Sequence, residues 1–306
     1  MMNDDSAVAI ILATYNGEKY LEEQLQSIVG QTHSNWQLIV GDDGSTDGTY
    51  AALQSFATKH KVTLRANARF GFVENFMSTL FLAEGNYDFY AFTDQDDVWH
   101  ADKLAQGLSA LRGVPSTAPA LYGARSRLMD ASGHPYGHSP LFNGPFHFRN
   151  ALVQCFAGGN TMIINRAAWE LLRAAKKMPL VSHDWWFYQL ISGAGGHILY
   201  DPVPRIDYRQ HGNAVVGSSA GVLASLARIR SLGKGVWKDW NDRHIAALQA
   251  NADMLTDANR QVLERFANAR KRGLVQRLAG VHASGVYRQT PLGNAGLLAA
   301  ALFNRM

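Results

Sequence analysis

The sequence predicts an α/β fold: a mainly parallel, Rossmann-like sheet with helices on both faces, followed by a C-terminal helical extension. Two observations predict it. Through the first hundred residues, short apolar runs alternate with segments whose apolar residues recur at helical spacing. From about residue 220 the strand signal almost disappears, and Ala, Leu and Arg dominate. We therefore expect a sheet-containing domain at residues 1–219 and a basic helical region at residues 220–306.

The first expected strand is Ala7–Thr14, an almost continuous apolar run of the kind found in strands buried on both faces. Further strands are expected at residues 36–40, 62–65, 87–93, 120–129 and 160–165, and helices at residues 49–59, 72–83, 166–177 and 182–192. Another helix is expected around Leu21, Leu25 and Ile28. Ser182 stands where an N-cap would begin the helix at 182–192.

The composition excludes several protein classes. The single cysteine, Cys155, cannot form an intrachain disulfide, which favours a reducing compartment. No segment reaches the roughly 18–20 apolar residues of a spanning helix. The acidic, polar N-terminus is unlike a signal peptide. We therefore expect a cytoplasmic protein.

The net charge of +4 is unevenly distributed. Residues 1–220 carry 16 Lys/Arg and 20 Asp/Glu, whereas residues 221–306 carry 13 and 5. A basic tail suggests an anionic partner, membrane lipid or nucleic acid, although a solvated helical face is the plain alternative. Nucleic acid is disfavoured because the tail has no recognised binding motif and few aromatic residues.

Three polar clusters follow expected strands. They are TYNG at residues 14–17, DDGSTD at residues 42–47 and DQDD at residues 94–97. Ligands of doubly wound sheets bind beyond the carboxyl ends of the strands, so parallel strands would place all three clusters on one edge. Turn and N-cap roles would account for the first two clusters alone, through Asn16-Gly17 and Asp47.

The third cluster is harder to explain without a ligand. Three carboxylates within four residues repel one another unless a cation joins them. Mg²⁺ and Mn²⁺ bind carboxylate oxygens and commonly keep substrate phosphates as further ligands. The chain has no GxGxxG after the first strand and no GxxxxGK[ST]. A nucleotide would therefore be held mainly by Tyr15, Asp43 and the metal.

Two later clusters are candidates for chemistry. His183-Asp184 begins an aromatic helix, where a carboxylate beside the indoles of Trp185 and Trp186 would bind a sugar and accept a proton. The alternative is an Asp favoured simply by the helix dipole. In YRQHGN, at residues 208–213, an arginine would contact a diphosphate and a histidine would bind the metal.

These clusters, in this order, make the sequence resemble glycosyltransferase family 2, whose members have the GT-A fold. The matching segments, within residues 7–217, are IILATYNGEKYLEEQLQSIVGQT, WQLIVGDDGSTDGT, FTDQDDVW, SHDWW and YRQHGNAVVG. Within the family, DQDDVW, HDWW and YRQHGN resemble the bacterial rhamnosyltransferase-type members that build surface polysaccharides.

The resemblance implies that Tyr15 stacks on a nucleobase, that Asp96 binds the metal and that Asp184 is the general base. His183 stands where the family usually has a Glu. The expected site residues are Asp184 for catalysis; Thr14, Tyr15, Asn16, Glu18, Asp43, Asp94, Gln95 and Arg209 for the nucleotide sugar; Asp96, Asp97 and His211 for Mg²⁺ or Mn²⁺; and Gly159, Asn160, His183, Trp185 and Trp186 for the acceptor.

We therefore expect an inverting, metal-dependent glycosyltransferase of surface polysaccharide synthesis, such as O-antigen synthesis, with dTDP-L-rhamnose as a candidate donor and a glycan or lipid-linked glycan as acceptor. One alternative is a nucleotidyltransferase of sugar-nucleotide metabolism, although residues 13–19 lack its Gly-rich phosphate loop. The other is an inactive, membrane-associated protein with the same fold, which the set Asp94, Asp96 and Asp184 disfavours.

The resemblance also suggests a use for the tail at the inner face of the cytoplasmic membrane. Its basic residues would attract anionic lipid, and its apolar residues would make a shallow contact. The residues concerned are Arg265, Arg270, Lys271, Arg272 and Arg277, with Leu297, Leu298, Leu302 and Phe303. Helix packing, including a homodimer, is the competing use.

Overall fold

A computed structural model describes residues 5–210 and 236–306 of the chain. The contacts divide the chain into two compact units, which are described separately here. The first comprises Met1–Pro140, Ala157–Arg173 and Leu199–Gly217, and the second comprises Leu141–Phe156, Ala174–Ile198 and Ser218–Met306. The second unit therefore joins the C-terminal region to two segments from the middle of the sequence. The domain boundary expected between residues 219 and 220 stays a prediction.

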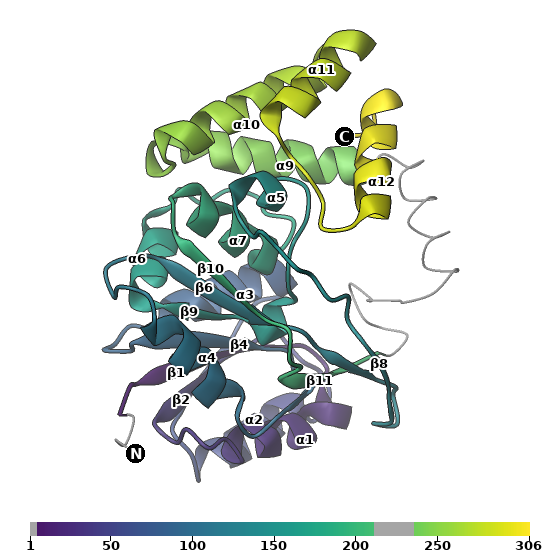
Figure 1. The fold of residues 1–306 in the computed structure, drawn as a ribbon. Helices are drawn as coiled ribbons and strands as arrows, with labels where there is room; N and C mark the ends of the chain where they lie inside the picture. The colour runs from purple at the N-terminus through teal and green to yellow at the C-terminus, as the bar shows by residue number, and fades with distance from the viewer. Residues whose placement is uncertain (1–4, 211–235) are drawn as a thin grey trace. The chain divides into compact units, whose positions relative to one another are not determined.

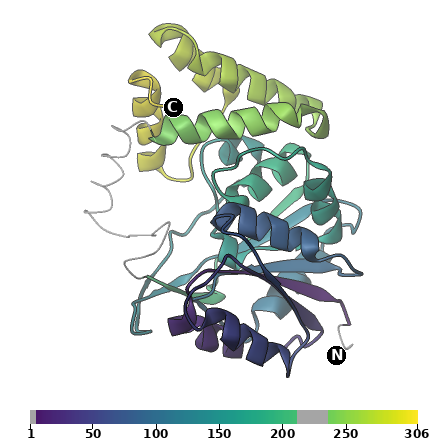
Figure 2. The ribbon, with the colours of Figure 1, turned by 180° about the vertical axis from the view of Figure 1, so that it is seen from behind.

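The first unit is built on a seven-stranded sheet in the order β10-β6-β9-β4-β1-β2-β3 (Figures 1 and 2). Its strands are β1 (Val8–Thr14), β2 (Trp36–Asp42), β3 (Val62–Ala66), β4 (Phe89–Thr93), β6 (Ala120–Ala124), β9 (Ile163–Asn165) and β10 (His197–Asp201). β1 pairs in parallel with β2 and β4, and β2 with β3, whereas β9 is antiparallel to β4 and β6. The expected mainly parallel α/β sheet is confirmed.

Helices cover both faces of this sheet. They are α1 (Glu18–Val29), α2 (Thr49–Ala57), α3 (Phe72–Leu82), α4 (Lys103–Arg112) and α6 (Arg166–Ala174). Successive strand residues point to opposite faces. Val8, Ile10 and Leu12 share a buried cluster with leucines of α1, α2 and α4. On the other face, the ring of Tyr90 on β4 stacks on Trp169 of α6, with centroids 5.4 Å apart.

The middle of the chain departs from the expected strands. Instead of one strand at 120–129, β6 is followed by β7 (Arg127–Met129), which belongs to a second, four-stranded sheet, β5-β11-β7-β8. The other strands of that sheet are β5 (Val98–Trp99), β8 (Pro135–His138) and β11 (Ile206–Arg209). The chain changes sheets where Arg125 N donates to Asp201 O at 2.9 Å. The strand expected at 160–165 begins as a 3₁₀ turn, η1 (Gly159–Thr161), because Thr161 N donates to Gly158 O.

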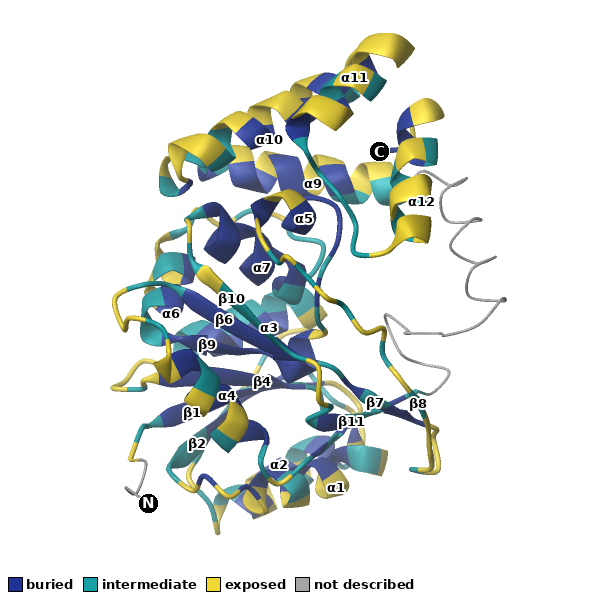
Figure 3. Ribbon diagram, viewed as in Figure 1, coloured by how far each residue is buried: buried dark blue, intermediate teal, exposed yellow. Residues whose placement is uncertain are grey.

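The second unit is helical. Its elements are α5 (Phe148–Ala151), α7 (His183–Gly193), α9 (Val236–Ala250), η2 (Ala252–Met254), α10 (Asp257–Arg270), α11 (Leu274–Ser284) and α12 (Pro291–Leu302). Every residue of α7 is buried except Asp184, and Figure 3 shows the contrast with the exposed faces of α11 and α12. The expected helical C-terminal region is confirmed, including a break at Gly273 between α10 and α11.

Close packing joins α10 to α11. A Cβ on Gly280 would lie 2.7 Å from the Cβ of Ala269, so a glycine at this position lets the two helices approach. Within the described ranges, no helix has both the length and the apolar character needed to cross a membrane.

Candidate active site

Three loops meet at one edge of the seven-stranded sheet, as the sequence predicts. They follow β1, β2 and β4, and the parallel pairing places Thr14 opposite Asp42. Thr14 Oγ1 donates to Asp42 Oδ1 at 2.9 Å, and Asn75 Nδ2, on α3, donates to Gly41 O at 2.9 Å. A Cβ on Gly41 would lie 2.3 Å from Asn75 Oδ1, so glycine makes room for this contact. The strand ends are thus fixed to each other and to a helix.

Tyr15 carries an exposed aromatic ring at this edge. Tyr15 N donates to Gln95 Oε1 at 2.9 Å, and Gln95 Nε2 donates to Tyr15 O at 3.0 Å. The side chain is 46% exposed, and the Arg69 guanidinium carbon lies 6.0 Å from the ring centre. An exposed ring on a tethered backbone is suited to stacking on a nucleobase. Gln95 serves Tyr15 through its backbone, and Arg69 is a neighbour that sequence reasoning missed.

Asp43 lies near the start of α3. Its side chain is only 6% exposed, and its two oxygens accept hydrogen bonds from Phe70 N at 2.6 Å and Gly71 N at 2.7 Å. Each carboxylate oxygen has a second lone pair, so Asp43 retains the capacity to accept a bond from a ligand. Its assignment to nucleotide binding stays a prediction.

Asn16 and Glu18 connect the first loop to the second. Asn16 Oδ1 accepts the N–H of Thr46 at 2.8 Å, and Glu18 Oε2 accepts the N–H of Gly48 at 2.9 Å. Asp47 Oδ2 in turn accepts the N–H of Glu18 at 3.2 Å. Both side chains are therefore engaged in shaping the edge, and a direct contact with the nucleotide sugar stays a prediction.

The acidic turn after β4 contains side chains of unequal exposure. Asp94 and Asp96 are partly exposed, whereas Asp97 is fully buried. Asp97 Oδ2 accepts a hydrogen bond from Asn160 Nδ2 at 2.6 Å, and Asp97 Oδ1 accepts one from Arg209 N at 3.2 Å. Burial, helped by the carboxylates of Asp94 and Asp96, raises the pKa of Asp97 well above its usual range.

Lys103, on α4, is a buried cation near this turn. Its Nζ donates to Phe92 O at 3.1 Å and to Asn160 O at 2.8 Å, and lies 3.3 Å from the centre of the Trp99 ring. Burial lowers the pKa of Lys103 well below its usual range, against the opposing effect of Asp97. Sequence reasoning missed this residue because a lysine in the first turn of a helix is normally exposed.

Arg209, at the end of β11, is 2% exposed. Its Nε donates to Asp96 O at 2.9 Å, and its Nη2 is paired with the carboxylate of Glu23 on α1. Its guanidinium also lies over the ring of Tyr20, 4.5 Å from the centre. Protein groups thus hold Nε and Nη2 of the guanidinium, and the expected contact of Arg209 with a diphosphate stays a prediction. His211, an expected metal ligand, lies outside the described residues.

The described part of the chain offers few side chains as ligands for the expected metal. Among residues 5–210 and 236–306, no three His, Cys, Asp or Glu side chains are grouped as metal ligands. Mg²⁺ in proteins is commonly bound by one or two carboxylates together with water and substrate phosphates. The partly exposed carboxylates of Asp94 and Asp96 fit that kind of site.

The second unit contains the expected general base. Asp184 Oδ1 accepts the N–H of Trp185 at 2.8 Å in the first turn of α7. Trp185 and Trp186, expected at the acceptor, are 7% and 2% exposed. Trp185 Nε1 donates to Ala151 O at 2.6 Å, and the ring meets that of His244 edge-on, with centroids 4.4 Å apart. The two indoles therefore pack in the interior of this unit.

The remaining acceptor candidates are buried too. His183 is 5% exposed, and burial lowers its pKa to about 4, with the Asp184 carboxylate opposing the shift. Its imidazole is therefore neutral at pH 7. In the first unit, Gly159 and Asn160 are buried in η1, and the Asn160 amide is held by Asp97. A direct contact of these residues with the acceptor stays a prediction.

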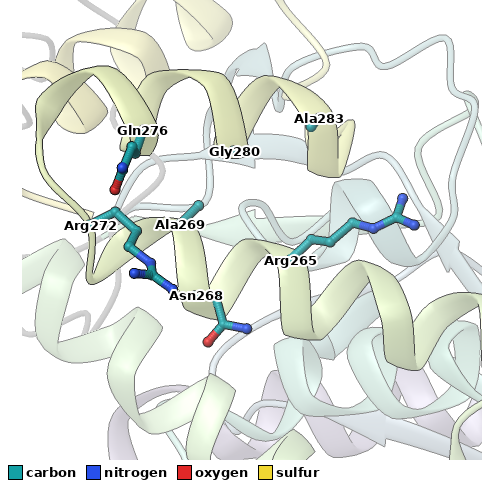
Figure 4. A pocket seen from close by; sticks show the side chains of 7 residues that line it. All are labelled: Arg265, Asn268, Ala269, Arg272, Gln276, Gly280 and Ala283. Carbon is teal, nitrogen blue, oxygen red and sulfur yellow. The ribbon is translucent and has the colours of Figure 1, made fainter.

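Two depressions on the C-terminal helices gather basic side chains. One, of about 440 Å³, is lined by Lys238, Asp242, Arg270, Lys271, Arg272, Arg277, Asn304 and Met306. The other, of about 460 Å³, is lined by Arg265, Asn268, Ala269, Arg272, Gln276, Gly280 and Ala283. Figure 4 shows the side chains of Arg265, on α10, and of Arg272, in the turn between α10 and α11, extending in different directions. Arg272 lines both depressions, so the two form one basic surface.

Not all of these basic residues are accessible. Arg277 Nε donates to Ala301 O at 2.6 Å, and Arg270 Nη2 lies 2.7 Å from Asp242 Oδ1. Both arginines are thus largely committed to holding the helices together. Lys271 and Arg272 are exposed, as is Phe303, at 70%.

Comparison with known proteins identifies the family. The sequence profile described as "Glycosyl transferase family 2" matches residues 9–172, which is more than half of the chain. The dTDP-rhamnosyl transferase RfbG of Shigella flexneri is 29% identical over 231 residues, covering 71% of this chain and 78% of that protein.

Two further proteins share parts of the sequence or the fold. An Escherichia coli enzyme, the UDP-Glc:alpha-D-GlcNAc-diphosphoundecaprenol beta-1,3-glucosyltransferase WfgD, is 34% identical over 108 residues, covering 35% of this chain and 42% of that enzyme. The mannosyltransferase PcManGT from Pyrobaculum calidifontis, solved in complex with GDP-Man and Mn²⁺, superposes with a TM-score of 0.52 at 21% identity, covering 99% of this chain and 86% of that chain. The expected GT-A glycosyltransferase is therefore confirmed, and the chain belongs to glycosyl transferase family 2.

Proposed function

We propose that this glycosyltransferase is an inverting, metal-dependent enzyme of bacterial surface polysaccharide synthesis. The observation that carries the proposal is the arrangement at one sheet edge. The exposed Tyr15 ring is joined through Gln95 to the turn that holds the partly exposed carboxylates of Asp94 and Asp96. One connected surface thus offers an aromatic face for a nucleobase and carboxylates for a cation bound to a diphosphate.

The donor end of the site follows from this arrangement. Tyr15 would stack on the base, Asp43 would accept a hydrogen bond from it, and Asp94 would lie near the ribose. Asp96 would hold Mg²⁺ or Mn²⁺, whose chemistry is to neutralise the charge that develops on the departing nucleoside diphosphate. The relative from Pyrobaculum, solved with GDP-Man and Mn²⁺, supports this choice of ligands.

The acceptor end would use Asp184 as the base. The acceptor hydroxyl oxygen forms a bond to the anomeric carbon while the bond from that carbon to the diphosphate oxygen breaks. The hydroxyl proton passes to the Asp184 carboxylate, and the nucleoside diphosphate leaves. A single displacement of this kind inverts the anomeric centre and needs no enzymic nucleophile. Asp184 fits the role because it is the part of α7 that is not buried.

The first donor to test is dTDP-L-rhamnose, because the Shigella relative is a dTDP-rhamnosyl transferase that aligns over 71% of this chain. For the acceptor we propose a lipid-linked glycan, as the name of the Escherichia coli relative records for that enzyme. The exposed basic and apolar side chains of the C-terminal helices would then hold the protein against the inner face of an anionic membrane.

A thermal-shift panel tests the donor and the metal together. dTDP-rhamnose, UDP-glucose and GDP-mannose are each added with Mn²⁺ and again with EDTA. Since a ligand that binds the folded state raises its melting temperature, we expect one nucleotide sugar to stabilise the protein, and to do so more strongly with Mn²⁺. Equal shifts with Mn²⁺ and EDTA would remove the metal from the proposal, and no shift with any nucleotide sugar would remove the donor site.

A further inference from the structure

We propose that Asp97 and Arg209 are positioning residues that hold Asp96 in place, and that Asp97 is not itself a metal ligand. The proposal rests on the metal-dependent function proposed above and assigns separate roles to the carboxylates of the acidic turn. Asp96 remains the residue that meets the cation, and Asp97 anchors the turn from its buried side.

The first argument comes from Asp97. A carboxylate that binds a hydrated cation must offer an oxygen to it, yet the Asp97 side chain is completely buried. Its oxygens accept hydrogen bonds from Asn160 Nδ2 at 2.6 Å and from Arg209 N at 3.2 Å, and a side chain with no exposed surface has no second lone pair open to a hydrated cation. Because these bonds come from η1 and β11, the carboxylate ties the turn after β4 to two distant parts of the first unit.

The second argument comes from Arg209, which contacts two successive residues of the turn. Its backbone N–H donates to Asp97, and its Nε donates to the carbonyl of Asp96 at 2.9 Å. Two bonds to neighbouring residues restrict rotation of the peptide between them. The far end of the guanidinium is anchored on α1, by the ion pair with Glu23 and the ring of Tyr20.

The third argument is that the network is closed. Lys103 Nζ donates to Asn160 O at 2.8 Å and to Phe92 O, on β4, at 3.1 Å. The partner of Asp97 is therefore itself tied to the strand that leads into the acidic turn. A buried polar network whose members are satisfied favours one conformation. Loss of such supporting contacts around a metal site typically costs about 10–100-fold in metal affinity.

The first experiment compares Arg209→Lys with Arg205→Lys. Lysine keeps the positive charge but cannot donate to Asp96 and Glu23 through a planar fork. Arg205 is a matched control, since it is a partly buried arginine of the same unit whose carboxylate partners are Asp201 and Asp102. Calorimetry measures the affinity for Mn²⁺ in the presence of a nucleoside diphosphate. We expect a loss of about 10–100-fold for Arg209→Lys and less than about threefold for Arg205→Lys, at similar melting temperatures.

The second experiment exchanges the Asp97–Asn160 pair. Asp97→Asn leaves one acceptor oxygen where the carboxylate accepts from both Asn160 Nδ2 and Arg209 N, and should weaken Mn²⁺ binding by about 10–100-fold. In the double variant Asp97→Asn/Asn160→Asp, the amide and carboxylate trade places, and the hydrogen bond can form in the opposite direction. We expect the double variant to bind Mn²⁺ within about threefold of the original protein. If Asp97 were a ligand, asparagine at that position could not restore binding, so a double variant as weak as the single one overturns the proposal.

The wild-type titration separates the two levels of inference. If wild type binds the nucleoside diphosphate no better with Mn²⁺ than with EDTA, the metal-dependent function fails, and a positioning role toward a metal fails with it. If wild type shows the metal effect but Arg209→Lys behaves like Arg205→Lys, the positioning role of Arg209 alone is wrong.

Discussion

Tyr15 and Gln95 are joined by two hydrogen bonds of opposite direction, from Tyr15 N to Gln95 Oε1 at 2.9 Å and from Gln95 Nε2 to Tyr15 O at 3.0 Å. A Cβ on Gly17 would lie 2.3 Å from Gln95 Oε1, so the glycine leaves room for the amide. The pair connects the loop after β1 with the acidic turn after β4. Hydrogen bonds therefore link Tyr15, which is proposed to stack on the nucleobase, to the turn whose carboxylates are proposed to bind the metal.

Gly17→Ala should disturb this pair. The added methyl group displaces the Gln95 amide, and the loss of two hydrogen bonds, each of about 1 kcal/mol, predicts a nucleoside diphosphate affinity lower by about tenfold or more. Gly30→Ala is the control, because a Cβ there would meet its nearest atom at 3.5 Å. Calorimetry with dTDP and UDP compares the variants, and equal affinities for Gly17→Ala and Gly30→Ala would contradict the prediction.

Asp184→Asn should separate binding from turnover. The amide cannot accept the acceptor proton, so we expect kcat to fall by about 10²–10⁴-fold while donor affinity changes little. Asp257→Asn, which changes a carboxylate in the first turn of α10, is the matched control. Turnover is measured with a defined glycan acceptor. Retained turnover in Asp184→Asn would exclude this residue as the base.

The buried His244 predicts a stability that falls with acidification. Burial lowers its pKa to about 3, and in the described part of the chain neither ring nitrogen has a hydrogen-bond partner. The unfolded chain gains a proton below pH 6.5, whereas the folded chain stays neutral. The contribution of neutral His244 to the free energy of unfolding is therefore complete above about pH 6.5. It is lost as the pH falls toward 3, at up to about 1.4 kcal/mol per pH unit.

His244→Phe should flatten that dependence, because phenylalanine keeps a ring against Trp185 without a titrating group. Urea unfolding at pH 7.5, 6 and 5 measures the free energy of unfolding at each pH. The control is His134→Phe, because the His134 side chain is 82% exposed. His183, whose pKa is lowered to about 4, adds a slope of the same sign, so some dependence remains in the variant. An unchanged slope in His244→Phe would show that another group controls acid stability.

The basic surface of the C-terminal helices predicts binding to anionic vesicles. Lys271→Glu/Arg272→Glu should weaken cosedimentation with phosphatidylglycerol vesicles by at least about tenfold, at about 1 kcal/mol per basic residue lost. Arg243→Glu/Arg260→Glu makes the same change in net charge at two arginines outside both depressions. An equal effect of both double variants would show that vesicle binding depends on the net charge of the protein and not on this basic surface. Unchanged sedimentation with a lost dimer in light scattering would instead favour dimerisation.

Local patterns predicted the centre of the fold well. The run at Ala7–Thr14 became β1, and the polar clusters after β1, β2 and β4 lie on one edge because those strands pair in parallel. The single strand expected at 120–129 was wrong, because the chain leaves the first sheet at Arg125, whose N–H bonds to Asp201. That partner is far away along the sequence, and no local periodicity encodes it.

The sequence predicted less about the candidate site than about the fold. The sequence places Trp185 and Trp186 on an aromatic helix whether they contact a sugar or pack in the core. Only the contacts of Trp185 with Ala151 and His244 show that this indole lies in the interior of the second unit. The sequence assigned Arg209 to a diphosphate, and that contact stays a prediction. Only the folded chain shows that its Nε donates to Asp96 O and its Nη2 pairs with Glu23.

The sequence by itself determined the order of strands and helices and which loops carry the carboxylates, since both depend on residues that are neighbours in the chain. Only the tertiary structure decided which carboxylate stays near the surface. Asp96 and Asp97 are adjacent and chemically identical, but Asp97 meets Asn160 and Arg209, 63 and 112 residues away along the chain. Burial of a charged side chain depends on such distant partners, because a carboxylate leaves water only where other groups replace its hydrogen bonds.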